Sequence, residues 1–511
     1  MTRHTGIPAG VQSSRDGRAA DPSAAGGLAA DARDRAAPSR LLARAAGALL
    51  LLAAGLVTAA APAPAADKPN IVYILADDAD VALTEHMPNV KSLIAARGAT
   101  FTSAYFNDPL CCPSRATILT GRYVQNTGVH TNSHRLFVDN GNPDRTFAVW
   151  LKAAGYRTGF IGKLLNGYPR PGSVSYRPPG WDYWAIRLDD GGITMDLQFD
   201  YRLAENGRAV SYGNATTDYS TDVYARKAAE FIRSTPAGTP LLLEVAVHAP
   251  HKPTTPAPRH ANSLSTIKAP RPPSFNEADV SDKPAYVREE GLVSGTTMDN
   301  QHRQRARSML AVDEAVKKIV DALSATGRLG NTYLIYSSDN GWLQGIHRLV
   351  RKGPPYEEGI KMPLYVRGPG ITAGSTVPHL VGNADFAPTF AEWAGTSPSA
   401  SVDGRSFAPL LRAGAPSPDA WRQTFPMWYA RRSSDGTQPG WSGLRTRTHA
   451  YVEYTNGEKE LYDMAADRYQ LNNIAKTADP GFLSRLSEAT RALYACSGDE
   501  CRRLENESVA P

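Results

Sequence analysis

The sequence predicts an α/β fold: a large domain with a central, mostly parallel sheet flanked by helices, and a smaller C-terminal α+β unit with an antiparallel sheet. Short apolar, β-rich runs alternate with segments of helical spacing over most of the chain. Such alternation is typical of a parallel sheet covered on both faces. Near the C-terminus, Asn456-Gly457 separates two alternating segments within Tyr451–Tyr462. This dipeptide is a strong signal for a tight antiparallel hairpin.

The first strand of the sheet is predicted at Asn70–Ala76, a β-rich run that is apolar after Asn70. Pro88–Arg97 has helical spacing and is followed by Gly98, a helix stop, after which Ala99–Phe106 is a second strand. Further strands are predicted at Arg157–Ile161, Leu241–Val247, Thr332–Tyr336 and Leu364–Val366, and further helices at Asp222–Ile232 and Gln304–Leu323. Residues 253–290, rich in Pro, Ser and charge, are expected to form a long surface loop near a site.

The composition shifts toward Pro, Ser and Gly around Ser397–Arg405 and Ala413–Pro418, which indicates a hinge into the smaller unit. That unit closes with a helix at about Pro480–Tyr494. Beyond this helix, Cys496 and Cys501 are spaced to close one small loop in an oxidising compartment. We therefore predict three parts: residues 1–66, 67–400 and 401–511.

The leader, residues 1–66, is predicted to be disordered up to residue 40 and then to contain a secretory signal. Residues 41–61 are nearly all apolar, interrupted by Arg44, and the small residues 62–66 follow. The apolar run after Arg44 is short for a membrane span. We expect a secreted or cell-surface protein with no stable membrane span after cleavage; an uncleaved anchor is the alternative.

The composition is that of a folded protein rather than a disordered one. Of 511 residues, 42% are hydrophobic and 21% charged, and the formal net charge is +6. The leader, with seven Arg and four Asp, supplies half of that excess. The remaining positive charge is small, so we expect no nucleic-acid partner.

Two polar pairs follow predicted strands directly: Asp77-Asp78 and Asp339-Asn340. Ligands in open α/β sheets bind beyond the carboxyl ends of strands, so the two pairs are expected to converge. Three carboxylates and an amide at one point would repel one another without a cation, and an all-oxygen set favours Ca²⁺ or Mg²⁺. A turn or a helix cap is the alternative for either pair alone.

The segment from Cys111 to Arg122 is the most specific motif in the chain. Pro113 suits the first turn of a helix and Gly121 its end. A cysteine at a helix N-terminus beside Arg115 favours anionic chemistry, although a buried thiol at a capped turn is the plainer interpretation. The whole pattern, Cys-x-Pro-Ser-Arg-x-x-x-Leu-Thr-Gly-Arg, resembles the sulfatase signature in full. The resemblance runs from about residue 68 to the C-terminus.

The resemblance implies an alkaline phosphatase-like fold, with 67–400 as the sulfatase catalytic domain. It implies that a formylglycine-generating enzyme or its equivalent converts Cys111 to formylglycine. One Ca²⁺ per chain would be bound by the modified Cys111 together with Asp77, Asp78, Asp339 and Asn340. Arg115 and Lys163 match the cations that hold the formylglycine diol. His251 matches the histidine on the scissile oxygen, and Lys352 the lysine on the sulfate oxygens.

Two further residues are weaker candidates for substrate contact. His248 lies close to His251 and either faces substrate or packs in the core. Asn166, in Gly162-Lys163-Leu164-Leu165-Asn166, falls where many arylsulfatases have a second histidine. The glucosamine-6-sulfatase group has a similar Lys-Tyr-Leu-Asn, so Asn166 is the expected substitute there.

Within the family, the sequence looks most similar to the N-acetylglucosamine-6-sulfatases and the extracellular heparan 6-O-endosulfatases. The similar segments are Pro109–Arg115, Arg177–Trp181 and Tyr451–Gly457. The implied reaction releases sulfate from a sulfated sugar or aryl ester, with N-acetylglucosamine-6-sulfate as one candidate. A formylglycine hydroxyl would attack sulfur with Asp339 as base, and His251 would protonate the leaving alcohol. The alternatives are a phosphate or phosphonate ester hydrolase of the same superfamily and a catalytically inactive glycan-binding protein.

Overall fold

The computed structural model describes residues 68–169, 173–189 and 196–509. The predicted leader and its secretory signal lie outside these residues. Within them, ten strands form one central sheet in the order β11-β2-β10-β9-β1-β8-β4-β5-β6-β7. The strands are β1 (Asn70–Ala76), β2 (Ala99–Phe101), β4 (Arg157–Gly162), β5 (Tyr183–Arg187), β6 (Tyr201–Glu205), β7 (Arg208–Tyr212), β8 (Leu241–Ala246), β9 (Thr332–Ser338), β10 (Leu364–Arg367) and β11 (Ser375–Val377).

The middle of the sheet is parallel, as predicted. β9, β1, β8, β4 and β5 are parallel neighbours in that order, and β10 then pairs antiparallel with β9. All seven residues of β1 are buried, which explains its continuous apolar sequence. Because these strands run the same way, their carboxyl ends meet at one edge of the sheet.

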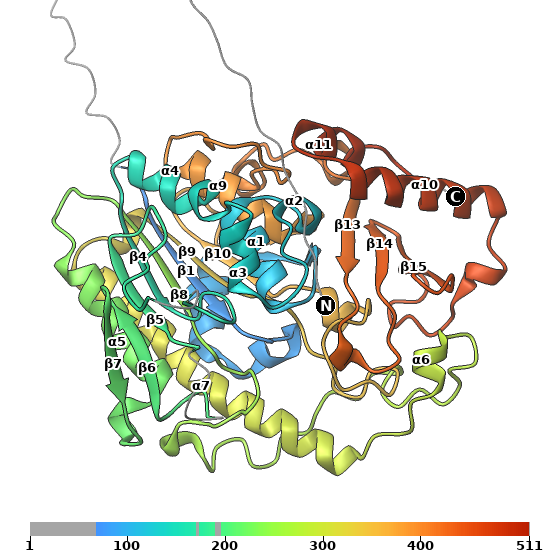
Figure 1. The fold of residues 1–511 in the computed structure, drawn as a ribbon, viewed down its shortest axis with the longest axis horizontal. Helices are drawn as coiled ribbons and strands as arrows, with labels where there is room; N and C mark the ends of the chain where they lie inside the picture. The colour runs from blue at the N-terminus through green and yellow to red at the C-terminus, as the bar shows by residue number, and fades with distance from the viewer. Residues whose placement is uncertain (1–67, 170–172, 190–195, 510–511) are drawn as a thin grey trace, which may run out of the picture. The chain divides into compact units, whose positions relative to one another are not determined.

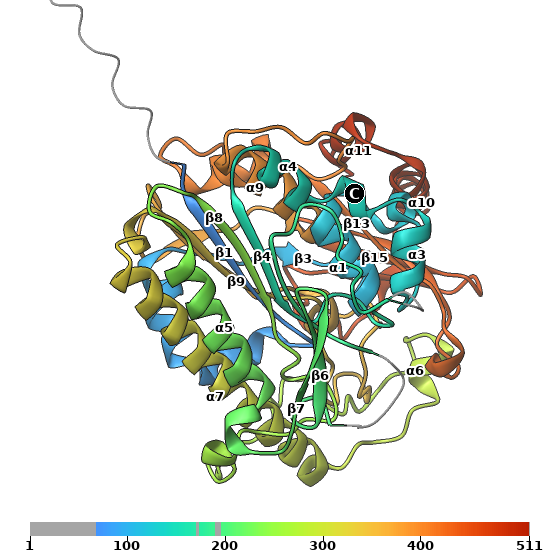
Figure 2. The same ribbon diagram turned by 60° about the vertical axis from the view of Figure 1, so that its left-hand side comes forward.

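Helices cover both faces of the central sheet (Figures 1 and 2). Ile71, Tyr73 and Leu75 belong to a core with residues of α1 (Cys111–Thr120), α4 (Phe147–Ala153) and α9 (Phe386–Trp393). Val72 and Ile74 point to the opposite face, where α5 (Ser220–Ser234) and α7 (Gly295–Ala325) pack. This alternation follows from the two-residue period of a strand. No helix in the described part of the chain is both long and apolar enough to span a bilayer.

Three local predictions were wrong or incomplete. Ala99–Phe106 is not one strand: β2 joins the central sheet, whereas β3 (Ala104–Tyr105) pairs with β12 (Val381–Gly382) in a separate two-stranded sheet. The predicted helix Pro88–Arg97 is a π-helical turn followed by a 3₁₀ turn. The antiparallel strands β6 and β7, which extend the sheet beyond β5, were not predicted.

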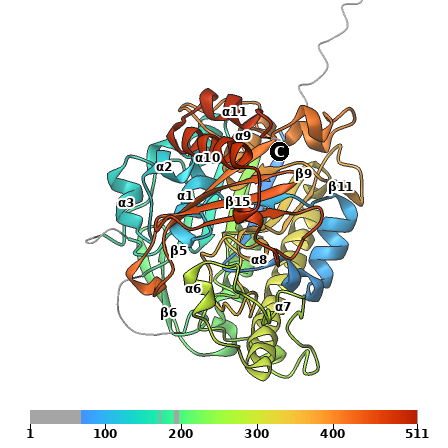
Figure 3. The same ribbon diagram turned by 90° about the vertical axis from the view of Figure 1, so that its right-hand side faces the viewer.

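The C-terminal segment forms a second, antiparallel sheet, also as predicted. Its strands are β13 (Thr424–Tyr429), β14 (Trp441–Thr446), β15 (His449–Tyr454) and β16 (Lys459–Asp463), and Asn456-Gly457 lies in the turn between the last two. Figure 3 shows α10 (Pro480–Ala495) and α11 (Asp499–Glu505) beside it, joined by the Cys496–Cys501 disulfide. Tyr105 and Tyr356 share a core with this sheet. A domain boundary between residues 400 and 401 stays a prediction.

A buried ion network ties the end of the chain to the body of the protein. The Arg422 guanidinium donates to both oxygens of Asp385, at 2.6 and 2.7 Å, and to Glu505 Oε2 at 2.8 Å. All three side chains are fully buried. Tyr123, from the turn after α1, donates a short hydrogen bond to Glu505. Three segments that are distant in sequence therefore depend on one guanidinium.

A buried carboxyl group lies inside the central sheet as well. Glu244 is in the middle of β8, opposite Tyr73 of β1 and Phe160 of β4, and is 2% exposed. Its Oε2 and the Tyr73 hydroxyl have no hydrogen-bond partner. Burial raises the pKa of Glu244 to about 8, despite the positive charge of Arg115.

Arg422→Met is expected to lower the free energy of unfolding by about 3–5 kcal/mol, because it leaves the buried Asp385 carboxylate without an ion-pair partner and leaves Glu505 with Arg405 alone. This change is measured by urea denaturation, with unfolding monitored by circular dichroism. Arg447→Met is the control, since Arg447 pairs with Asp419 on an exposed surface, and its effect should stay within about 0.5 kcal/mol. Equal effects of the two variants would show that the network is not structurally important.

Glu244 is expected to contribute stability that is lost as the pH rises from about 5 to about 8. The free energy of unfolding of Glu244→Gln should therefore fall less, or rise more, than that of the wild type over this range. In this window the unfolded chain has released the Glu244 proton whereas the folded chain keeps it, so unfolding releases a proton. Within this window, Glu244 lowers the free energy of unfolding by at most about 1.4 kcal/mol per pH unit. If the free energy of unfolding changed with pH in the same way in the wild type and in Glu244→Gln, this prediction would be wrong.

Candidate active site

The predicted site residues converge at the carboxyl edge of the parallel strands. Each follows the end of a strand or begins a helix there. They are Lys163 after β4, His248 and His251 after β8, Asp77 and Asp78 after β1, Asp339 and Asn340 after β9, and Cys111 at the start of α1. The convergence expected from the sequence is therefore present.

Local backbone geometry explains two of these positions. Gly162 has a φ of +105°, and a Cβ there would lie 1.9 Å from the Ala246 carbonyl oxygen, so only glycine fits. The next amide, Lys163 N, donates to that same oxygen at 2.8 Å, which places Lys163 at the edge. Asp78 also has a positive φ, 66°, which Asp tolerates better than most residues. The chain turns there, and both consecutive carboxylates reach the site.

The thiol of Cys111 lies among two carboxylates and a lysine. Its Sγ is 3.6 Å from Asp77 Oδ1 and 4.0 Å from Asp78 Oδ1, and the Lys352 ammonium donates to it at 2.9 Å. Cys111 itself is 0% exposed. Burial raises the pKa of the thiol to about 12, despite Lys163 and Lys352, so the neutral thiol predominates at physiological pH.

Arg115 is one turn further along α1 and connects two strand ends. Its Nε donates to Asp339 Oδ2 at 2.8 Å, and its Nη1 donates to the Lys163 carbonyl at 2.7 Å. The second terminal nitrogen, Nη2, is buried without a partner. Arg115 therefore fixes the position of Asp339 relative to the end of β4.

Each of the three carboxylates pairs with one lysine or arginine. Besides the Arg115–Asp339 pair, the Lys163 ammonium is 2.5 Å from Asp77 Oδ2, and the Lys352 ammonium is 2.6 Å from Asp78 Oδ1. Burial alone would raise the pKa of Asp77, but Lys163 and the other cations hold it well below its usual range. The pKa of Asp339 is raised, because burial and the charge of Asp77 outweigh Arg115.

The oxygen atoms around Asp78 form a donor set suited to a hard cation. Asp339 Oδ1 accepts from the Asp78 amide at 3.0 Å, and Asn340 Nδ2 donates to Asp78 Oδ1 at 2.6 Å. Asn340 Oδ1 is buried and has no hydrogen-bond partner. One ligand atom each from Asp77, Asp78, Cys111 and His251 lies within 4.8 Å of the others. Buried carboxylates with an unpartnered amide oxygen match the ligands that Ca²⁺ takes.

The two histidines differ in exposure and hydrogen bonding. His251 is 27% exposed, its Nδ1 lies 2.5 Å from the Lys252 carbonyl oxygen, and its Nε2 is 3.7 Å from Asp78 Oδ2. An Nδ1 that donates to a carbonyl leaves Nε2 to exchange a proton with the site. His248 is buried, with Nδ1 3.3 Å from the Tyr224 hydroxyl. Burial and nearby cations hold the pKa of His248 well below its usual range, so it stays neutral.

Asn166 lies beside the neighbouring cysteine rather than Cys111. Its backbone amide donates to Cys112 Sγ at 3.1 Å, and the Cys112 thiol donates to Asn166 Oδ1 at 3.4 Å. Asn132, which the sequence reasoning missed, accepts from the Cys112 amide at 3.0 Å. Tyr224 was also missed as the partner of His248. No local motif distinguishes either residue, since each comes from a segment distant in sequence.

The comparisons with known proteins agree with this geometry. Residues 69–396 match the family model "Sulfatase", and residues 345–489 match "N-sulphoglucosamine sulphohydrolase, C-terminal". The N-acetylglucosamine-6-sulfatase of Capra hircus is 35% identical over 482 residues, 85% of each chain. The extracellular sulfatase SULF-1 homolog of Drosophila melanogaster is 35% identical over 363 residues, which cover 67% of this chain and 31% of that protein.

Solved structures give the same result at the level of the fold. A protein solved in complex with its substrate D-glucosamine-2-N,6-O-disulfate superposes with a TM-score of 0.74 at 25% identity. The match covers 86% of this chain and 99% of that one. The family match over most of the chain, together with the converged signature residues, shows that this protein belongs to the sulfatase family of sulfuric ester hydrolases.

Proposed function

We propose that this sulfatase releases sulfate from a sulfated sugar, using one bound Ca²⁺ and a formylglycine that is made from Cys111. N-acetylglucosamine-6-sulfate is the first substrate to test. The observation that carries the proposal is the position of Cys111, at the N-terminus of α1 and in contact with Asp77, Asp78 and Lys352. The relatives named for action on glucosamine sulfates support the choice of sugar.

The residues present fit a calcium site. Asp77, Asp78, Asp339 and Asn340 would hold the ion together with the modified residue 111, and the unpartnered Asn340 Oδ1 supports this set. Bound there, Ca²⁺ would offset the negative charge of the sulfate ester and favour ionisation of the formylglycine hydroxyl.

The other side chains have separable roles. A sulfate ester carries negative charge that must be offset before a nucleophile approaches, and Arg115, Lys163 and Lys352 supply positive charge around position 111. Asp339, held by Arg115, serves as the base for the attacking hydroxyl. His251 Nε2 donates a proton to the leaving alcohol as general acid. His248 and Asn166 are proposed as substrate contacts, His248 in its neutral form.

The remaining expectations are proposals of the same kind. Maturation requires a formylglycine-generating enzyme or an equivalent. Secretion or a cell-surface location is supported by the apolar segment at 41–61 and by the relative named as an extracellular sulfatase.

In an active preparation, the tryptic peptide of residues 98–115 is expected to carry an aldehyde in place of the Cys111 thiol. Mass spectrometry of that peptide and sulfate release from N-acetylglucosamine-6-sulfate are the two measurements. Cys111→Ala should abolish turnover, whereas the matched variant Cys112→Ala should keep the modification and most of the activity. Unmodified Cys111 in protein that turns over substrate would disprove the formylglycine proposal.

The same assay separates the competing functions. Faster turnover of nitrophenyl phosphate than of nitrophenyl sulfate and the sulfated sugar would favour a phosphate ester hydrolase. A modified protein that binds sulfated glycans without releasing sulfate would be an inactive binding protein.

Calcium is expected to raise the thermal unfolding midpoint of the wild type, by an amount that grows with the logarithm of the ratio of Ca²⁺ concentration to Kd. Asp78→Asn should weaken Ca²⁺ affinity by roughly tenfold or more, because an anionic ligand is lost. Isothermal titration calorimetry with CaCl₂ after chelation measures the affinity. Asp80→Asn is the control: Asp80 is buried two residues away but pairs with Arg305. Equal Ca²⁺ affinities in both variants would exclude Asp78 as a ligand.

A further inference from the structure

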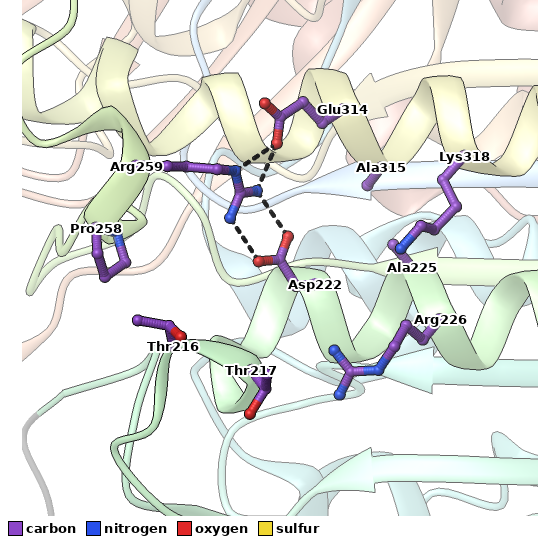
Figure 4. A pocket seen from close by; sticks show the side chains of 10 residues that line it. All are labelled: Thr216, Thr217, Asp222, Ala225, Arg226, Pro258, Arg259, Glu314, Ala315 and Lys318. Atoms are coloured by element: carbon purple, nitrogen blue, oxygen red, sulfur yellow. Dashed lines mark hydrogen bonds and ion pairs between the residues drawn. The ribbon is translucent and has the colours of Figure 1, made fainter.

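A second pocket, of about 590 Å³, lies between the outer sides of α5 and α7 (Figure 4). Thr216 and Thr217 precede α5 at one wall, and Pro258 and Arg259 contribute from the loop after β8. None of the residues assigned above to the active site lines this pocket. It is therefore a separate feature of the surface.

The two acidic side chains of this pocket share one arginine as their ion-pair partner. The Arg259 guanidinium donates to both oxygens of Asp222, at 2.6 and 2.8 Å, and its Nε donates to Glu314 Oε2 at 2.7 Å. His260 lies 2.9 Å from the other Glu314 oxygen. Figure 4 shows Arg259 extended between the two carboxylates, which come from different helices.

The remaining charge of the pocket is positive. Arg226 of α5 and Lys318 of α7 line it, and neither side chain makes a hydrogen bond or ion pair with any other described residue. In Figure 4 both side chains extend from adjacent helices on the same side of the Arg259 cluster. The charged residues that line the pocket carry a net charge of +1, with Arg226, Arg259 and Lys318 against Asp222 and Glu314. This positive excess and the nearby threonine hydroxyls match an oxyanion, which accepts hydrogen bonds and needs opposite charge.

We propose that this pocket binds the sulfate groups of an anionic polysaccharide while another sulfate of the same chain occupies the active site. The inference rests on the proposed function for the class of ligand. It assigns to Arg226 and Lys318 a role in holding extended substrates, separate from the hydrolytic step.

The chain itself limits how far the pocket lies from the active site. Arg259 is eight residues from His251, so the two are separated by no more than about 28 Å even if the loop is fully extended. The backbone of α5 passes both places: Tyr224 contacts His248, and Arg226, two residues further along, lies on a different face of the helix and lines the pocket. An oligosaccharide of several sugars can span such a distance, whereas a monosaccharide cannot.

Charge complementarity favours a polymer over a free anion. Each exposed ion pair contributes little alone, so two cations would hold a single free sulfate weakly. A ligand already bound at one site has a high effective concentration at the second, which turns weak contacts into useful affinity. The pocket should therefore affect long substrates and leave short ones unchanged.

The test uses the double variant Arg226→Ala/Lys318→Ala and its matched control Arg233→Ala/Lys317→Ala, which removes the same two residue types from the same helices outside the pocket. In the Cys111→Ala background, equilibrium binding of fluorescent heparin is expected to weaken roughly three- to tenfold for the pocket variant and less than twofold for the control. Thermal midpoints verify that both variants are folded.

Kinetics with active protein gives the second readout. The KM for a sulfated oligosaccharide should rise in the pocket variant by a similar factor, with kcat and the KM for N-acetylglucosamine-6-sulfate unchanged. Equal heparin affinities of the pocket variant and the control would overturn the proposal, since only total charge would then matter. If heparin binding weakens selectively but no variant releases sulfate, the pocket assignment stands and the proposed hydrolytic function fails.

Discussion

The structure depends on the compensation of three carboxylates buried at one edge of a parallel sheet. Asp77, Asp78 and Asp339 are almost inaccessible to water, where unpaired charge is costly. Each is matched by a cation from a different segment: Lys163 from the end of β4, Lys352 from the loop after β9, and Arg115 from α1. The charges that would act on a sulfate ester are therefore also those that allow the acidic cluster to fold.

The scaffold positions most of these charges through strand ends and a helix start, and Lys352 alone comes from a loop. Parallel strands bring Lys163, Asp77 and Asp339 to one edge, and Gly162 permits the close approach of β4 and β8 that places Lys163. The N-terminus of α1 then adds a favourable field for an anion beside Cys111. A site built in this way needs little rearrangement to meet a charged substrate.

The sequence was informative wherever a local pattern had one meaning. The apolar run at 70–76 and the Asn456-Gly457 turn predicted a buried strand and a hairpin, and both are present. The prediction of one continuous strand at Ala99–Phe106 was wrong. The chain leaves one sheet for another at residues 102–103, and this break depends on strand pairing with segments that are distant in sequence. For the same reason the Tyr224–His248 contact could not be predicted, since tertiary packing alone brings α5 to the end of β8.

The complete burial of Cys111 has a consequence for the order of events during biosynthesis. The thiol lies beneath the Lys352 loop with 0% of the residue accessible, and the adjacent Cys112 is equally enclosed. A thiol enclosed in this way is out of reach of a modifying enzyme once the helix has packed. Under the proposed function, conversion of Cys111 would therefore have to precede the folding of this segment.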